Sequence, residues 1–209
     1  NVPPAGSRKG PIVETKNPIS EEMAALRPRL LPGALAVMQH NRNHGQEALR
    51  VFETGRVYRR ATDEDDPVVP GYVEHPALLI ALSGPHAPTG WDTDPRTVDL
   101  FDLKGTVELL LDDLRVPDPA LVPREETETP ITTHAIDVNA GDTPLGTLAR
   151  VRDEVADEVD LVDPVFVAEL NLAWMVEVAA PELQRTYEPV SRHPVVARDL
   201  AVLVHADQP

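Results

Sequence analysis

The chain has 209 residues, 42% of them hydrophobic, and its 35 acidic against 19 basic side chains give a formal net charge of −16. So negative a charge disfavours broad nucleic-acid binding, unless arginines gather on one face. The absence of cysteine excludes disulfides and cysteine nucleophiles, and no apolar run reaches the roughly 18 residues of a membrane span. Since the sequence starts without Met and ends just after a strand-like run, we expect a fragment of a longer cytoplasmic protein.

The first third of the chain predicts one clear helix. The run from Leu30 to His44 carries a proline in its first turn, and Gly45 stands just past its end. Before it, Ser20 is placed to cap residues 21–27 if that turn is helical. The helix has a modest apolar stripe of Leu31, Leu35 and Met38, and the basic residue Arg42 continues the same line.

Strands and a second helix follow. Residues 48–60 and 75–84 read as strands, the second apolar throughout and therefore buried. Residues 99–116 predict the best helix of the chain, with aspartates near its start, where the helix dipole favours acids. Its apolar stripe consists of Leu103, Val107, Leu110, Leu111 and Leu114.

The second half of the chain is dominated by strand-like runs. They cover residues 131–139, 145–152, 164–172 and 196–205, and the first two are expected to form a hairpin with a long loop over 139–146. Helices are few and no regular strand–helix alternation appears. The predicted fold class is α+β, an antiparallel sheet backed by helices.

Two carboxylates interrupt otherwise apolar strand faces. Glu53 shares its face with Val51 and Val57, and Glu169 shares its face with Val167. They are either a general acid/base pair or two structural acids, each bonded to an arginine or to backbone amides. No G-x-S-x-G, G-x-x-x-x-G-K-[ST] or G-x-G-x-x-G motif accompanies them, so the structural interpretation is favoured.

Other candidate sites are weaker. His40 and His44 have the i, i+4 spacing of a two-histidine zinc face, but the zincin glutamate is missing, so solvated histidines at a helix end are the favoured reading. The acidic run at residues 63–66 is expected to be a solvated loop. Arg27 and Arg29 are too few for a specific phosphate site. No metal site is predicted.

Four stretches together resemble the β subunit of bacterial phenylalanine–tRNA ligase. They are residues 17–41, "VFETGRVY" at 51–58, "FDLKGTVELLL" at 101–111 and "YEPVSRHPVVARDLAVLV" at 187–204, in the order that the family shows. The resemblance covers about residues 17–205, more loosely over 61–95 and 117–164. It implies a class II aminoacyl-tRNA synthetase-like catalytic fold, which agrees with the α+β prediction.

The resemblance also implies a catalytically silent copy of that fold. A working class II site holds ATP with an arginine after a strand and a second arginine of G-x-G-x-x-R type. The second signature is absent, since "LGTLAR" at residues 145–150 has one glycine and lies in a predicted strand. Glu53 and Glu169 would then mark a vestigial pocket, and no catalytic residue is assigned.

The family further implies partners, cofactors and domain limits. The helix near residues 30–44 would belong to the dimerisation motif of an α2β2 assembly, with Leu35, Met38 and Arg42 facing the α subunit; the alternative is that Leu35 and Met38 cover this chain's own sheet. ATP and Mg²⁺ would serve the whole complex, which charges tRNA. Residues 1–188 would form the silent core, and 189–209 would begin a truncated C-terminal, ferredoxin-like anticodon-binding domain.

Three functions remain open from the sequence. The first is a non-catalytic core that scaffolds the α subunit of the ligase and is inactive alone. The second is a free-standing hydrolase or lyase using Glu53 and Glu169; close approach of the two carboxylates would favour it, and burial against arginines would not. The third is a tRNA-binding module. No membrane or DNA partner is expected.

Overall fold

A six-stranded antiparallel sheet forms the centre of the molecule. The structure is a computed structural model that describes residues 12–15, 17, 24–63, 65, 67–87, 90–91, 96–125 and 129–180. The strand order is β3-β4-β8-β7-β6-β5, and every neighbouring pair is antiparallel. The bounds are β3 Leu49–Arg60, β4 Tyr72–Ser83, β5 Pro119–Pro123, β6 Thr132–Ala140, β7 Thr143–Val151 and β8 Val165–Asn171.

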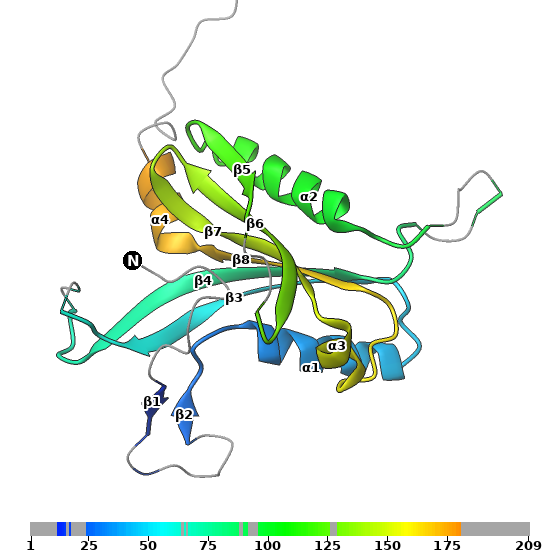
Figure 1. The fold of residues 1–209 in the computed structure, drawn as a ribbon, viewed down its shortest axis with the longest axis horizontal. Coiled ribbons are helices and arrows are strands. Elements are labelled where there is room, and N and C mark those ends of the chain that lie inside the picture. Colours follow the sequence, from blue (N-terminus) through cyan, green and yellow to red (C-terminus); the bar gives the residue numbers. More distant parts are fainter. Residues whose placement is uncertain are drawn as a thin grey trace, which may run out of the picture.

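Helices cover both faces of this sheet (Figure 1). Helices α2 (Leu100–Asp113) and α4 (Leu172–Ala179) lie on one face, and α1 (Leu31–Asn43) and the short α3 (Asp153–Asp157) lie on the other. A separate two-stranded sheet joins β1 (Val13–Glu14) to β2 (Ala25–Leu26). The predicted α+β class and the antiparallel sheet are confirmed. No helix in the described ranges is long and apolar enough to cross a membrane.

The α2/α4 face is filled by hydrocarbon. Leu103, Val107 and Leu111 of α2 are fully buried, as is Met175 of α4. They pack on the even-numbered apolar residues of β4 and on β6, β7 and β8. The leucine stripe predicted for residues 99–116 is therefore the contact between α2 and the sheet.

The α1 face has its own apolar cluster. Leu31, Leu35 and Met38 of α1 pack on Leu79 and Val167 of the sheet. The sequence left open whether Leu35 and Met38 face a partner or this chain's sheet. The structure places both in the chain's own core, with Leu35 5% and Met38 0% exposed. The stripe looks sparse along the helix, but β3, β4 and β8 complete its burial.

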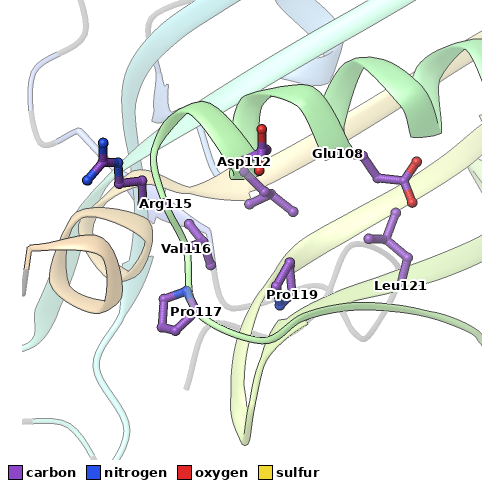
Figure 2. Close-up of a pocket in the computed structure, with 8 residues that line it drawn as sticks. Glu108, Asp112, Arg115, Val116, Pro117, Pro119 and Leu121 are labelled. Carbon is purple, nitrogen blue, oxygen red and sulfur yellow. The ribbon is translucent and has the colours of Figure 1, made fainter. Parts of the chain in front are cut away.

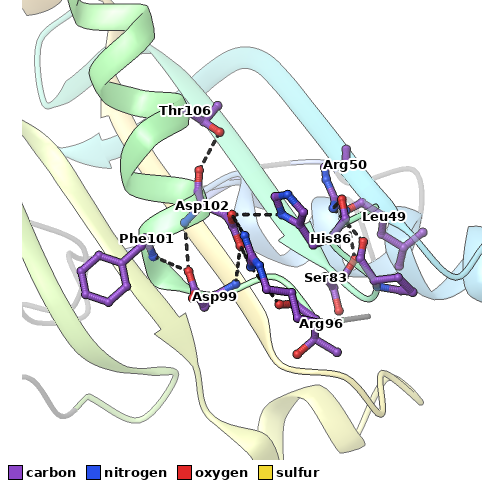
Figure 3. A network of polar contacts seen from close by, with 11 residues as sticks. Leu49, Arg50, Ser83, His86, Arg96, Asp99, Phe101, Asp102 and Thr106 are labelled. Atoms are coloured by element: carbon purple, nitrogen blue, oxygen red, sulfur yellow. Dashed lines mark hydrogen bonds and ion pairs between the residues drawn. The ribbon is translucent and has the colours of Figure 1, made fainter. Parts of the chain in front are cut away.

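Polar contacts set the start of α2. The Asp99 side chain accepts hydrogen bonds from the backbone N–H groups of Phe101 and Asp102. The Asp102 side chain in turn accepts one from the backbone N–H of Asp99, which makes a capping box. Arg96 donates to both Asp102 oxygens at 2.7 and 2.8 Å, and these hydrogen bonds hold the pKa of Asp102 well below its usual range. Figure 3 shows this network beside His86.

Three local predictions need correction. Residues 25–26 are a strand, so the expected helical turn over 21–27 is wrong there, and its capping residue Ser20 lies outside the described residues. The loop expected over 139–146 is only Gly141 and Asp142, because the strands β6 and β7 extend into it. The acidic run is not simply solvated, since Asp65 is bound by Arg59 through two hydrogen bonds of 2.6 and 2.5 Å.

Candidate functional site

The register of the sheet brings the two predicted carboxylates onto one face. Glu53 pairs with Leu79, and Leu79 pairs with Glu169 on its other side. Residues directly opposite one another in a sheet point to the same face. Glu53 and Glu169 therefore share the α1 face, with the fully buried Leu79 between them. Two strand spacings separate their backbones by about 10 Å.

Each glutamate is bonded to an arginine from one short segment of the chain. Arg27 donates to Glu53 over 2.6 Å, and Arg29 donates to Glu169 through Nε over 2.9 Å and also through Nη2. Both arginines belong to the link between β2 and α1, which crosses the sheet beside β3. The backbone of that link is fixed by the Tyr58 N–H donating to the Arg27 carbonyl over 3.0 Å.

The two ion pairs differ in burial. Arg29 and Glu169 keep only 23% and 15% of their side-chain exposure, whereas Arg27 and Glu53 keep 47% and 34%. Glu53 also lies against the first turn of α1, because its Oε2 is 3.8 Å from where a Cβ at Gly33 would stand. The Glu53 carboxyl group therefore lies beside both the Arg27 guanidinium and the amino end of α1.

Gly55 makes room for Arg27. A Cβ at this position would overlap the Arg27 guanidinium and come within 3.1 Å of Leu30. Arg27 uses the space to donate to the Arg56 carbonyl over 2.9 Å as well as to Glu53. A glycine inside a strand often marks such a close approach, and this signal was available in the sequence.

A third arginine–carboxylate pair continues the same row. Asp137 stands opposite Thr147, which stands opposite Glu169. Arg124 donates through Nε to Asp137 over 3.1 Å, and through Nη2 to Thr147 over 3.2 Å. Sequence reasoning missed this pair because nothing local to either residue distinguishes it. We call the three pairs, Arg27–Glu53, Arg29–Glu169 and Arg124–Asp137, the ion-pair row.

Further along this face, the paired strands β3 and β4 extend past the end of β8, which reaches only from Ala77 to Ser83 on β4. Arg59 lies there, and its hydrogen bonds hold the pKa of Asp65 well below its usual range. The backbone N–H of Thr62 adds a bond to Asp65 over 2.7 Å. Burial, with the Arg59 charge, lowers the pKa of His75.

The remaining sequence candidates are placed as follows. Arg42 forms an ion pair with Asp163 over 3.4 Å at the end of α1. His40 and His44 stack with ring centroids 4.3 Å apart, and His44 Nδ1 bonds the His40 carbonyl over 2.7 Å. The described part of the chain contains no cluster of three or more residues suited to a metal ion.

The arrangement suits structural ion pairing better than acid/base chemistry. Each carboxylate of the row accepts from a guanidinium of the same chain, and a buried apolar side chain separates the two glutamates. Acid/base catalysis needs one group poised to take or give a proton at a reacting atom. Glu53 and Glu169 thus have the arginine partners that the structural interpretation requires. The hydrolase or lyase alternative has no support in this geometry.

Comparison with solved structures identifies the fold. The chain is similar to pyrrolysyl-tRNA synthetase from Desulfitobacterium hafniense, with a TM-score of 0.61 at 16% identity over 82% of this chain and 54% of that chain. A second structure of this synthetase from the same organism gives a TM-score of 0.58 at 18% identity, over 75% of this chain and 51% of that chain. The expected class II synthetase-like fold is confirmed.

Comparison of sequences identifies the family. The chain is 73% identical over its full length to the phenylalanine–tRNA ligase β subunit of Salinibacter ruber, covering 26% of that protein. It is 36% identical to the β subunit of Symbiobacterium thermophilum, over 91% of this chain and 20% of that protein. The chain thus spans about a quarter of the curated relatives it matches. A model of the phenylalanyl tRNA synthetase beta chain CLM domain matches residues 5–172, and the chain belongs to that family.

Proposed function

We propose that this chain is the silent, synthetase-like core of a phenylalanine–tRNA ligase β subunit and scaffolds the α subunit that performs the chemistry. The whole complex would activate phenylalanine with ATP and Mg²⁺ and transfer it to tRNA in the cytoplasm. Residues 1–188 would form the core, and residues 189–209 would begin the C-terminal anticodon-binding domain. The core alone would be inactive.

The pairing of Arg27 and Arg29 with Glu53 and Glu169 is the observation that carries this proposal. A synthetase active site must offer cations to the phosphates of ATP. Here two arginines above the sheet donate instead to carboxylates of the same chain. The row is a filled, charge-balanced surface, and we infer that it replaces a substrate pocket.

The outward side of α1 is the proposed contact with the α subunit. Leu35 and Met38 hold the helix on the sheet. The opposite side exposes the small and apolar residues Pro32, Gly33, Ala36 and Val37, with His40 beside them. Val37 is 49% exposed. Small residues let another helix approach closely, which suits a helical interface of an α2β2 assembly. Arg42, at the end of the same helix, would lie at the rim of this contact.

Reconstitution tests the proposal. The full-length β subunit and the α subunit are co-expressed, and their dissociation constant and phenylalanine-dependent ATP–pyrophosphate exchange are measured. Val37→Asp should weaken association at least tenfold, about 1.4 kcal/mol, while leaving the unfolding of the β subunit unchanged. Val176→Asp is the matched control, since Val176 is 59% exposed on α4, at the other face of the sheet.

Three results would contradict the proposal. Equal association of the Val37→Asp and Val176→Asp variants would remove α1 from the interface. Phenylalanine-dependent exchange by the β subunit without α would mean that this core, or another part of β, is active. Loss of exchange in the complex on substituting Arg27 or Arg29, with association intact, would show that the arginines act on substrate.

A further inference from the structure

Helix α2 carries large apolar side chains on the side that faces away from the sheet. Phe101 is 77% exposed and Leu109 is 70% exposed, although both stand on a well-capped helix. They are eight residues apart, with Gly105 midway, and the i, i+4, i+8 spacing puts all three on one side of the helix. We call Phe101, Gly105 and Leu109 the α2 strip.

Packing within the described part of the chain does not require a glycine at position 105. A Cβ built at this position meets no atom within 4 Å, so alanine would fit without displacing anything. Glycine is one of the least favourable residues inside a helix, and alanine is the most favourable. A bare helix backbone between two exposed apolar side chains forms a notch into which another element can pack closely.

A hollow adjoins the strip at the carboxyl end of the helix (Figure 2). It has a volume of about 390 Å³ and lies between α2 and β5. Leu111, Val116 and Leu121 supply apolar lining, and Glu108 and Asp112 add two carboxylates. Glu108 and Asp112 follow Gly105 and Leu109 by three residues each, and residues three apart are neighbours on a helix surface, so the hollow adjoins the strip.

The charge of this surface selects its partner. Glu108, Asp112 and Asp113 are all exposed on α2. Lys104 forms an ion pair with Glu108, and Arg115 lines the hollow, so the acidic groups remain in excess. A partner must therefore offer an apolar face flanked by Lys or Arg, which also disfavours RNA as the occupant.

We propose that the α2 strip and its adjoining hollow dock a helix from another part of the same β-subunit polypeptide, with small and apolar residues on its contact face and basic residues at its edges. The 73% identical relative is about four times as long as this chain, so most of such a subunit lies outside this domain. Helix α4, which ends at Ala179, packs in the same cluster as α2. This inference does not depend on the proposed α1 interface.

Photo-crosslinking in the intact αβ complex tests the docking. p-Benzoylphenylalanine replaces Phe101 in the full-length β subunit, the purified complex is irradiated, and crosslinked peptides are identified by mass spectrometry. The expected product joins Phe101 to a segment of the same β polypeptide, outside the region matched by this chain, that carries at least two Lys or Arg residues near the attachment point.

A second substitution tests the notch. Gly105→Gln should lower the crosslink yield from position 101 at least fivefold, because the longer side chain fills the space between Phe101 and Leu109. It should not unfold the helix, since glutamine is a better helix former than glycine. Thr106→Gln is the matched control, placed 100° around α2 on an exposed position, and should leave the yield within twofold.

Three other outcomes overturn the inference. A crosslink to the α subunit, to a second β copy or to bound tRNA would give the strip a different occupant. The absence of any crosslink, while the same reagent at Val37 reports a neighbour, would leave the strip solvent-exposed. Equal yields in the Gly105→Gln and Thr106→Gln variants would exclude close approach at Gly105. If Val37 reports no neighbour but Phe101 crosslinks within β, the proposed scaffold function fails and the docking stands.

Discussion

The two faces of the sheet are covered in different ways. On the α2/α4 face the contact is hydrocarbon throughout, with Leu103, Val107 and Leu111 fully buried. On the α1 face a similar apolar cluster borders the ion-pair row, where Arg29 and Glu169 are largely shielded from solvent. Burying a charge costs free energy that only a well-matched partner offsets. The α1 face thus contains shielded charges that need matched partners, and the contact on the α2/α4 face does not.

The difference shows which contacts the packing of a helix on this sheet requires. An apolar face is sufficient to hold a helix on a sheet, as α2 demonstrates. Ion pairs are not needed for that purpose, and replacing a buried pair by apolar residues is often neutral or stabilising. The ion-pair row is therefore not required to hold α1 on the sheet.

The largest expected effect comes from charging the apolar part of the α1 face. Met38→Asp should lower the free energy of unfolding by about 3–5 kcal/mol, because it buries an unpaired carboxylate at a position with 0% exposure. Urea denaturation followed by circular dichroism measures the loss. The neighbouring Val37→Asp should change stability by less than about 1 kcal/mol. Similar losses for both variants would mean that α1 does not rest on the sheet as described.

Breaking the more buried ion pair should have the next largest effect. Glu169→Gln leaves Arg29 without its countercharge, and we expect a loss of about 2–3 kcal/mol. Glu53→Gln should cost less than about 1 kcal/mol, because the Arg27–Glu53 pair is more exposed to solvent. The double variant Arg29→Met/Glu169→Gln should recover part of the loss. Equal losses from the two single variants would contradict the difference in burial.

Much of this architecture could be predicted from local sequence. The limits of α1 and α2 follow from Pro32, Gly45 and the aspartates near residue 99, and the apolar run of β4 marks a central strand. The antiparallel fold class also followed from strands joined without regular helices. These features depend on residues close together in the chain, so the pattern carries the information.

The candidate site was harder to predict because its partner residues are distant in sequence. Arg29 and Glu169 are 140 residues apart, and only the register of β4 with β3 and β8 shows that Leu79 separates the two glutamates. The sequence offered arginine as one structural partner for each glutamate without identifying which arginine. The Arg124–Asp137 pair had no signal at all, since its two residues meet only through the β5–β6 pairing.

Glycine-to-alanine substitutions should have opposite effects on stability at the α1 face and on helix α2. Gly55→Ala should cost about 1 kcal/mol, since the new Cβ displaces Arg27 from Glu53 and presses on Leu30. Gly105→Ala on α2 should instead stabilise the chain by about 0.5–1 kcal/mol, because its Cβ meets nothing. Both are measured by urea denaturation. In an Arg27→Ala background the cost of Gly55→Ala should shrink; an unchanged cost would place the strain on Leu30 alone.

The smallest expected effect is a pH dependence that the ion pair at the hairpin end imposes. Arg59 holds the pKa of Asp65 well below the value near 4 that the unfolded chain shows. Above pH 5 both states are ionised and the stabilisation is complete. As the pH falls below about 4, Asp65 takes up a proton in the unfolded chain but stays ionised in the folded chain, so the free energy of unfolding falls. The lowered pKa of Asp102 adds a further loss of stability at low pH. The lowered pKa of His75 adds another, which begins as the pH falls below about 6.5.

These contributions can be separated by substitution. Asp65→Asn should be less stable at pH 7 and should flatten the fall in stability between pH 5 and pH 3, while leaving the region from pH 7 to pH 5.5 unchanged. His75→Gln should flatten the fall in stability that begins below about pH 6.5, where the unfolded chain takes up a proton on this histidine. Urea midpoints recorded at half-unit pH steps distinguish the two. If the stability of Asp65→Asn fell with pH as steeply as that of the wild type below pH 5, the Asp65 carboxyl group would have an ordinary pKa in the folded wild type. The hydrogen bonds from Arg59 would then not stabilise the projecting part of β3 and β4.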